Sequence, residues 1–86
     1  MNLKRGIVVG QMLTVGKELI RISPKDARKI EYSDNGGRVW RIRYIGLSAT
    51  GEFQDLKGSG KELRALTSKG VFYSQNAGRS WIFRGY

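Results

Sequence analysis

The chain has 86 residues and a mass of 9.7 kDa, and 16 lysines and arginines against 7 acidic residues give it a net charge of +9. This length fits one domain with one small core. The absence of cysteine excludes disulfides, thiolate metal sites and thiol nucleophiles, and the absence of histidine removes the commonest general base and metal ligand. We therefore expect neither an enzyme nor a cofactor or metal site.

Short alternating runs of apolar residues predict β-strands along the chain. In the segment around Ile30 and Tyr32, for example, these two side chains share one face while Lys29 and Glu31 share the other. Turn signals rich in glycine separate the runs, and no apolar pattern of helical period lasts for three turns. In chain order, the expected strands are centred on residues 20–22, 29–32, 39–44, 63–65, 71–73 and 81–84. The sequence therefore predicts an all-β fold, a small antiparallel β domain.

The chain contains an internal repeat. Residues 32–40 and 73–81 lie 41 residues apart, and both read Tyr-Ser-x-Asn-x-Gly-Arg-x-Trp. Upstream, the Gly-Lys-Glu-Leu of residues 16–19 returns at residues 60–63. A unit of roughly forty residues has the length of one four-stranded antiparallel unit. We expect a single domain over residues 1–86, built from units that span approximately residues 6–45 and 46–86.

The repeated segment suits a hairpin turn between two strands. Asparagine and serine side chains can bond to nearby backbone groups, glycine supplies a positive φ, and tryptophan buries a large ring beneath the turn. Every residue type thus has a folding role, so we interpret the segments as structural. Their defining residues are Ser33, Asn35, Gly37 and Trp40 in the first box (residues 33–40), and Ser74, Asn76, Gly78 and Trp81 in the second box (residues 74–81).

Both boxes resemble the Asp-box, also called the BNR repeat, whose pattern is Ser-x-Asp-x-Gly-x-x-Trp. Each copy departs from that pattern by carrying asparagine, Asn35 or Asn76, where aspartate is usual. The resemblance implies a hairpin between the third and fourth strands of a β-propeller blade, as in sialidases and sortilin-type receptors. It implies no activity, because the box is structural in that family and occurs in enzymes, lectins and receptors alike.

Two units leave the architecture open. A closed propeller needs about four blades or more, so the units either pack together as a small sandwich or barrel, or join a ring of several chains. Three chains would give six blades, for example. We favour the self-contained domain, because the high positive charge opposes close packing of identical chains.

The net charge suggests a polyanion as partner. A basic sheet face can follow the phosphates of a nucleic acid with little sequence preference. Strict alternation would place Arg41 and Arg43 opposite Trp40, Ile42 and Tyr44, so that both arginines project into solvent. The candidate polyanion-binding residues are Lys29, Arg38, Arg41, Arg43, Arg79 and Arg84.

Two other kinds of binding module are alternatives. Tyrosines near the hairpins could stack on the faces of sugars, and the candidates are Tyr32, Tyr44, Tyr73 and Tyr86. An exposed strand edge could instead recruit a protein by adding a strand to the sheet. No membrane insertion is expected, since the apolar stretch of residues 6–15 has about half the length of a spanning helix. We expect a cytoplasmic location, with an extracellular one as the alternative.

Overall fold

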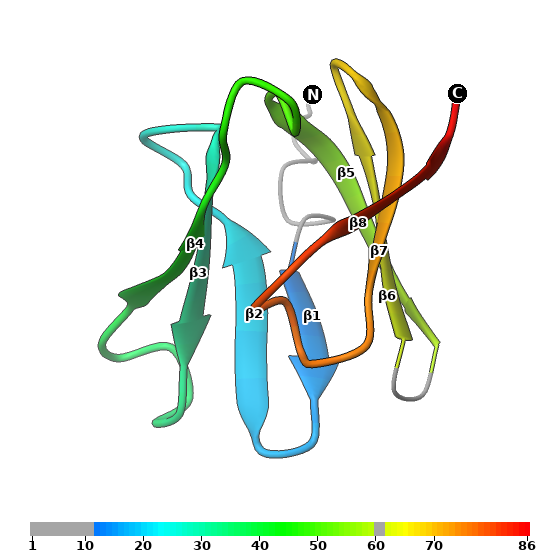
Figure 1. Ribbon diagram of the computed structural model, residues 1–86. Helices are drawn as coiled ribbons and strands as arrows, with labels where there is room; N and C mark the ends of the chain where they lie inside the picture. Colours follow the sequence, from blue (N-terminus) through cyan, green and yellow to red (C-terminus); the bar gives the residue numbers. More distant parts are fainter. Residues whose placement is uncertain (1–11, 60–61) are drawn as a thin grey trace, which may run out of the picture.

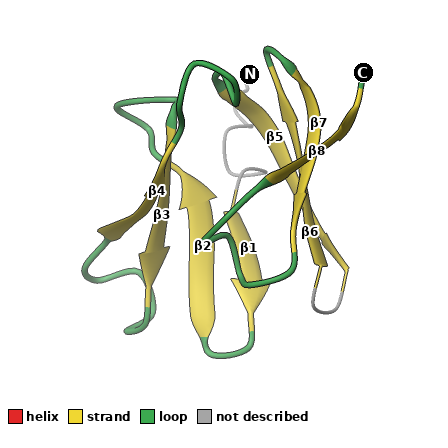
Figure 2. Ribbon diagram, viewed as in Figure 1, coloured by secondary structure: helices red, strands yellow, loops and turns green. Residues whose placement is uncertain are grey.

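The computed structural model describes residues 12–59 and 62–86 and shows eight antiparallel strands in two sheets (Figure 1). The described residues form strands, loops and turns without a helix (Figure 2), which confirms the predicted all-β fold. No helix in this part of the chain is long and apolar enough to cross a membrane. Residues 6–11 of the first expected unit, and Gly60 and Lys61 of the repeated tetrapeptide, lie outside the described residues.

Each sheet is a meander in which consecutive strands are neighbours. The first sheet contains β1 (Met12–Val15), β2 (Glu18–Ile22), β3 (Lys29–Ser33) and β4 (Arg41–Ile45). The second contains β5 (Phe53–Ser59), β6 (Glu62–Thr67), β7 (Gly70–Ser74) and β8 (Ile82–Gly85). In both sheets the order follows the chain because short turns join antiparallel neighbours.

The pairing registers of the two sheets match. Val15 pairs with Glu18 as Ser59 pairs with Glu62, at positions 44 residues later. Across the box hairpins, Tyr32–Arg41 and Tyr73–Ile82 are matched pairs 41 residues apart. Each of these two hairpins also has a register shift at the same place, after Ile30 in the first sheet and after Val71 in the second.

The hydrophobic core lies between the two sheets. One face of the first sheet packs on one face of the second, and β5 lies against β1 and β2. Alternation along each strand selects the core residues, because only every second side chain points to the partner sheet. The buried members are Ile20, Ile30, Phe53, Leu56, Leu63, Ala65, Phe72 and Trp81.

The two box tryptophans differ in burial. Trp81 is 9% exposed, its ring lies 5.4 Å from that of Phe53, and its indole N–H donates to the carbonyl oxygen of Gly78 at 3.1 Å. Trp40 is half-buried on the outer side of the first sheet, where the Arg21 guanidinium lies 4.0 Å from its ring. The expectation that both rings are core residues is therefore wrong for Trp40, because no second sheet formed by residues 12–59 and 62–86 covers its side of the molecule.

Replacing Trp81 by alanine should destabilise the protein more than replacing Trp40. Removing a buried ring leaves a cavity and costs about 3–5 kcal/mol, whereas the loss of a half-buried ring stacked on an arginine should cost about 1–2 kcal/mol. Urea unfolding followed by circular dichroism measures both free energies. Equal losses for Trp40→Ala and Trp81→Ala would contradict this assignment of the core.

Candidate functional site

The first box forms the turn between β3 and β4. The Ser33 hydroxyl donates to Asn35 Oδ1 at 2.8 Å and accepts a hydrogen bond from the backbone N–H of Gly37 at 2.9 Å. Asn35 Oδ1 also accepts from the N–H of Val39 at 3.0 Å. Gly37 has a φ of +92°, which confirms the positive φ predicted for this glycine. The side chains thus close the turn from within.

The second box forms the turn between β7 and β8 with the same bonds. Ser74 Oγ donates to Asn76 Oδ1 at 2.8 Å and accepts from the N–H of Gly78 at 2.9 Å, and Asn76 Oδ1 accepts from the N–H of Ser80 at 2.9 Å. The amide of Asn76 adds one further bond, donating to Ser80 Oγ at 2.8 Å. Both turns are therefore fixed by side chains of the same types at matching positions.

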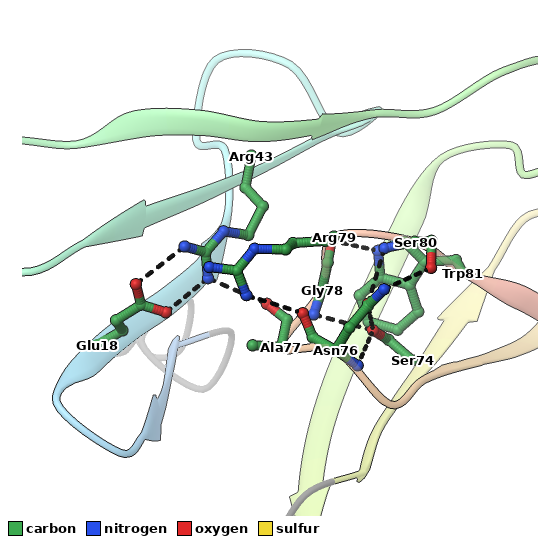
Figure 3. A network of polar contacts seen from close by, with 9 residues as sticks. All are labelled: Glu18, Arg43, Ser74, Asn76, Ala77, Gly78, Arg79, Ser80 and Trp81. Carbon is green, nitrogen blue, oxygen red and sulfur yellow. Dashed lines mark hydrogen bonds and ion pairs between the residues drawn. The ribbon is translucent and has the colours of Figure 1, made fainter.

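Arg43 joins the first sheet to the second box (Figure 3). Its guanidinium makes two bonds to the Glu18 carboxylate, at 2.6 and 2.9 Å, and donates to the carbonyl oxygen of Ala77 at 3.2 Å. The guanidinium also lies 3.9 Å from the centre of the Tyr32 ring. Only 5% of the Arg43 side chain is exposed. We call the set Glu18, Tyr32 and Arg43 the first clasp.

The first clasp shifts the ionisation of its own members. The hydrogen bonds from Arg43 lower the pKa of Glu18, and partial burial of the carboxylate works against that effect. The positive charges of Arg43 and Arg79 lower the pKa of Glu18 further. The pKa of Arg43 is raised, chiefly by its hydrogen bonds to Glu18. Both groups are thus held in their charged forms.

A groove of about 420 Å³ lies beside the first clasp, between the β1–β2 turn and the second box. Glu18 lies on one side of this groove, and Asn76 and Arg79 lie on the other. The Arg79 guanidinium donates to the carbonyl oxygen of Asn76 at 3.1 Å. The groove therefore combines a carboxylate, an amide and a guanidinium at the end of the molecule where the box turns lie (Figure 1).

The structure gathers only part of the predicted basic set. Arg38, Arg41 and Arg79 are exposed, and they lie in the box turns or at the start of β4. No ion pair holds any of these three within residues 12–59 and 62–86. Lys29 lies at the opposite end of the first sheet, paired in register with Ile45, with its ammonium 3.9 Å from Asp26. Arg84 lies on β8, paired with Glu62 at 3.0 Å.

The expected projection of Arg43 into solvent is wrong, because the second box packs on the face of the first sheet that carries Arg43. Strict alternation would separate Arg43 from Tyr44. The register shift in the β3–β4 pairing places Ile42 opposite Glu31 but Tyr44 opposite Ile30, which leaves Arg43 as an extra residue. Tyr44 consequently turns to the same side as Arg43, toward the second sheet.

Most of the tyrosines proposed for sugar stacking are engaged within the protein. Guanidiniums cover the rings of Tyr32 and Tyr73, with Arg84 at 4.1 Å from the latter. Tyr44 packs edge-on against Phe53 and shares a hydrogen bond of 2.9 Å with the Thr50 hydroxyl. Tyr86 is fully exposed and lies against Phe83, with ring centres 5.1 Å apart.

Glu18 and Lys17 are two further charged residues at this end that do not belong to the predicted basic set. Glu18 holds Arg43, and Lys17 is exposed in the β1–β2 turn, at the same end of the molecule as the boxes. The sequence did contain a signal for Glu18, because the repeated Gly-Lys-Glu-Leu places a glutamate at the same position in both units. Within the described ranges, no three carboxylates form a group that could hold a metal ion.

A scan against protein-family models and searches of curated proteins and solved structures found no match to this chain.

Acidification should weaken the fold through Glu18. The ordinary pKa of this carboxyl is 4.5, and folding lowers it, so its stabilising effect is complete above that value and is lost as the pH falls through the folded-state pKa. In a series from about pH 6 to pH 3, the difference in unfolding free energy between the parent protein and Glu18→Gln should therefore stay constant down to about pH 5 and shrink below that. Urea titrations across this range measure it.

Glu52→Gln is the matched control, because Glu52 is exposed in the loop before β5. Its effect on stability should be small at every pH in the series. A Glu18→Gln difference that stays constant across the range would contradict the proposed link between Glu18 ionisation and stability.

Proposed function

We propose that this protein is a non-catalytic binding module, built from two Asp-box units, that binds polyanions at the end carrying the box turns. The observation that carries the proposal is the set of exposed basic side chains at that end. Arg38 and Arg79 come from the two boxes, Arg41 begins β4, and Lys17 lies in the neighbouring turn.

The charge balance at this end supports the proposal. The nearby carboxylates among the described residues are Asp34 in the first box, Glu18 and Glu62. Glu18 is already paired with Arg43, and Glu62 with Arg64 and Arg84. Exposed guanidiniums without a carboxylate partner can contact phosphates without first breaking an ion pair. A polyanion at this end would release counterions, so its affinity should fall steeply with salt.

The likeness to the Asp-box rests on residue spacing and on turn geometry. Both boxes follow the third strand of a four-stranded meander and precede the fourth. In each, serine and asparagine side chains close the turn and tryptophan follows, which is the structural role that the resemblance implies. On this proposal the boxes build the scaffold, and the charged residues between the box positions meet the ligand.

Polyanion binding is tested by fluorescence anisotropy with labelled single-stranded and duplex nucleic acid, at about 50 and 200 mM salt. We expect binding that weakens strongly at the higher salt. Arg38→Gln with Arg41→Gln should weaken it at least tenfold, through the loss of two phosphate contacts.

The matched control is Lys25→Gln with Lys69→Gln, which removes the same charge from the opposite end of the molecule. It should change the affinity far less than the arginine pair. Equal losses for the two double variants would show that net charge alone attracts the ligand, and flat titrations at both salts would contradict polyanion binding.

A carbohydrate is the second candidate ligand, favoured by an apolar hollow at the other end. The hollow measures about 570 Å³, and Phe72, Phe83 and Tyr86 contribute aromatic surface to its wall. Aromatic rings beside polar groups such as Lys69 and Ser68 suit the stacking of a sugar ring.

A sugar in this hollow should bind independently of salt, because stacking releases no counterions. Glycan-array binding that persists at about 500 mM salt and disappears in Tyr86→Ala would support this second candidate. Binding that is unchanged in Tyr86→Ala would contradict it.

A further inference from the structure

Each sheet has two distinct faces, and within residues 12–59 and 62–86 only one face of each packs against the other sheet. In the first sheet, the first clasp lies on the same face as Ile20 and Ile30. We call this face, and the corresponding face of the second sheet, the clasp face. The opposite face of each sheet carries the tryptophan of its box, and we call it the box face. In the second sheet, the box face contains Leu63, Phe72 and Trp81. The clasp face of the first sheet packs on the box face of the second, where Gly78 lies near Ile30.

The second sheet repeats the clasp on its outer face. The Arg84 guanidinium lies 4.1 Å from the Tyr73 ring and donates to Glu62 at 3.0 Å. In the pairing registers, these three residues occupy the positions of Arg43, Tyr32 and Glu18. We call Glu62, Tyr73 and Arg84 the second clasp. Arg84 is 41% exposed, against 5% for Arg43, and no box carbonyl reaches it within residues 12–59 and 62–86.

The first box presents the matching acceptor on the other outer face of the molecule. Gly36 corresponds to Ala77, whose carbonyl oxygen Arg43 binds, and both residues have positive φ, +78° and +61°. The next residues, Gly37 and Gly78, have φ of +92° and +88°. The turn bonds around them also match in partners and lengths. The carbonyl of Gly36 is therefore held in the same kind of turn, and Gly36 is exposed.

We propose that copies of this chain join head to tail into a closed ring, with the second clasp of one copy holding the first box of the next. In this contact Arg84 donates to the carbonyl oxygen of Gly36 of the neighbouring copy, as Arg43 donates to Ala77 within the chain. The proposal does not rest on polyanion binding. A contact between two different faces joins copies head to tail. Such a row of copies closes into a ring when the rotation from one copy to the next permits closure.

The outer faces are more polar than the faces that meet inside the chain. On the clasp face of the second sheet, Arg64 occupies the position that Ile20 has in the first sheet. On the box face of the first sheet, Arg21 occupies the position that Ala65 has in the second sheet. Arg21 bonds to Glu31 at 2.8 Å and Arg64 to Glu62 at 3.3 Å, so these arginines are already paired on their own faces. We therefore expect assembly that depends on concentration, with each copy folded on its own.

Apolar side chains are also exposed on both outer faces. Leu66 is 48% exposed on the clasp face of the second sheet, and Met12 is 44% exposed on the box face of the first sheet. Their counterparts inside the chain, Ile22 and Leu56, pack in or against the core. A ring would cover all of these positions and would place every box turn at the same end.

The test is the mass of the intact protein by light scattering after size exclusion, from about 10 µM to about 1 mM. A closed propeller has about four to eight blades, so the mass should level off at two, three or four times 9.7 kDa. Arg84→Ala should remain at the mass of one chain where the parent protein assembles.

Arg28→Ala is the matched control, since Arg28 is also exposed and paired with a carboxylate, Asp26, but lies outside both outer faces. A second pair of variants tests the same contact through apolar residues. Leu66→Glu should prevent assembly, and Leu47→Glu, in the loop after β4, should not. Circular dichroism melting confirms that each variant is folded.

The proposal is overturned by a single-chain mass at every concentration, or by Arg84→Ala that assembles like the parent protein. A mass that grows without levelling off would overturn closure of the ring.

Discussion

The guanidinium of Arg43 connects the two halves of this protein. It is almost fully buried, so its charge and its N–H groups must find partners inside the fold. Glu18 supplies the charge from β2, and the Ala77 carbonyl supplies the remaining acceptor from the second box. Because these partners come from different sheets, the buried guanidinium fixes where the second box lies on the first sheet. Gly78 then fits beside Ile30, and the Trp81 ring closes the core.

The asparagine of the second box gives its turn a hydrogen bond that aspartate could not make. An aspartate at position 76 would still accept the hydrogen bond from the N–H of Ser80, but it could not donate to Ser80 Oγ as the amide of Asn76 does. The neutral amide also leaves Arg79 without a carboxylate in its own turn. Substituting asparagine for aspartate therefore keeps the turn closed and keeps the basic end of the molecule free of two negative charges.

The sequence is sufficient to predict the strands and the turns, but not a β-bulge or the sheet face that the other sheet covers. Periodicity of two located β3 and β7, and the side-chain types of the boxes predicted turns that the hydrogen bonds confirm. Tyr44 faces the second sheet, against the predicted alternation, because one extra residue in β4 reverses the facing of those that follow. The burial of Arg43 depends on the second box, which packs on the face that carries it. The unequal burial of Trp40 and Trp81 cannot be predicted from the local sequence pattern. It depends on which face of each sheet packs against the other sheet.

The central claim is that one clasp works inside the chain while its copy on the outer face lacks a partner box. The most direct measurement compares Arg43→Ala with Arg84→Ala in urea unfolding, at a concentration where the protein is a single chain. Arg43→Ala should lose about 2–3 kcal/mol, because it removes charge-assisted bonds and leaves Glu18 and the Ala77 carbonyl without their donor. Arg84→Ala, whose ion pair is exposed, should lose less than about 1 kcal/mol. Equal losses would contradict the claim. They would show that Arg84 contributes as much to the stability of a single chain as Arg43, which binds the second box.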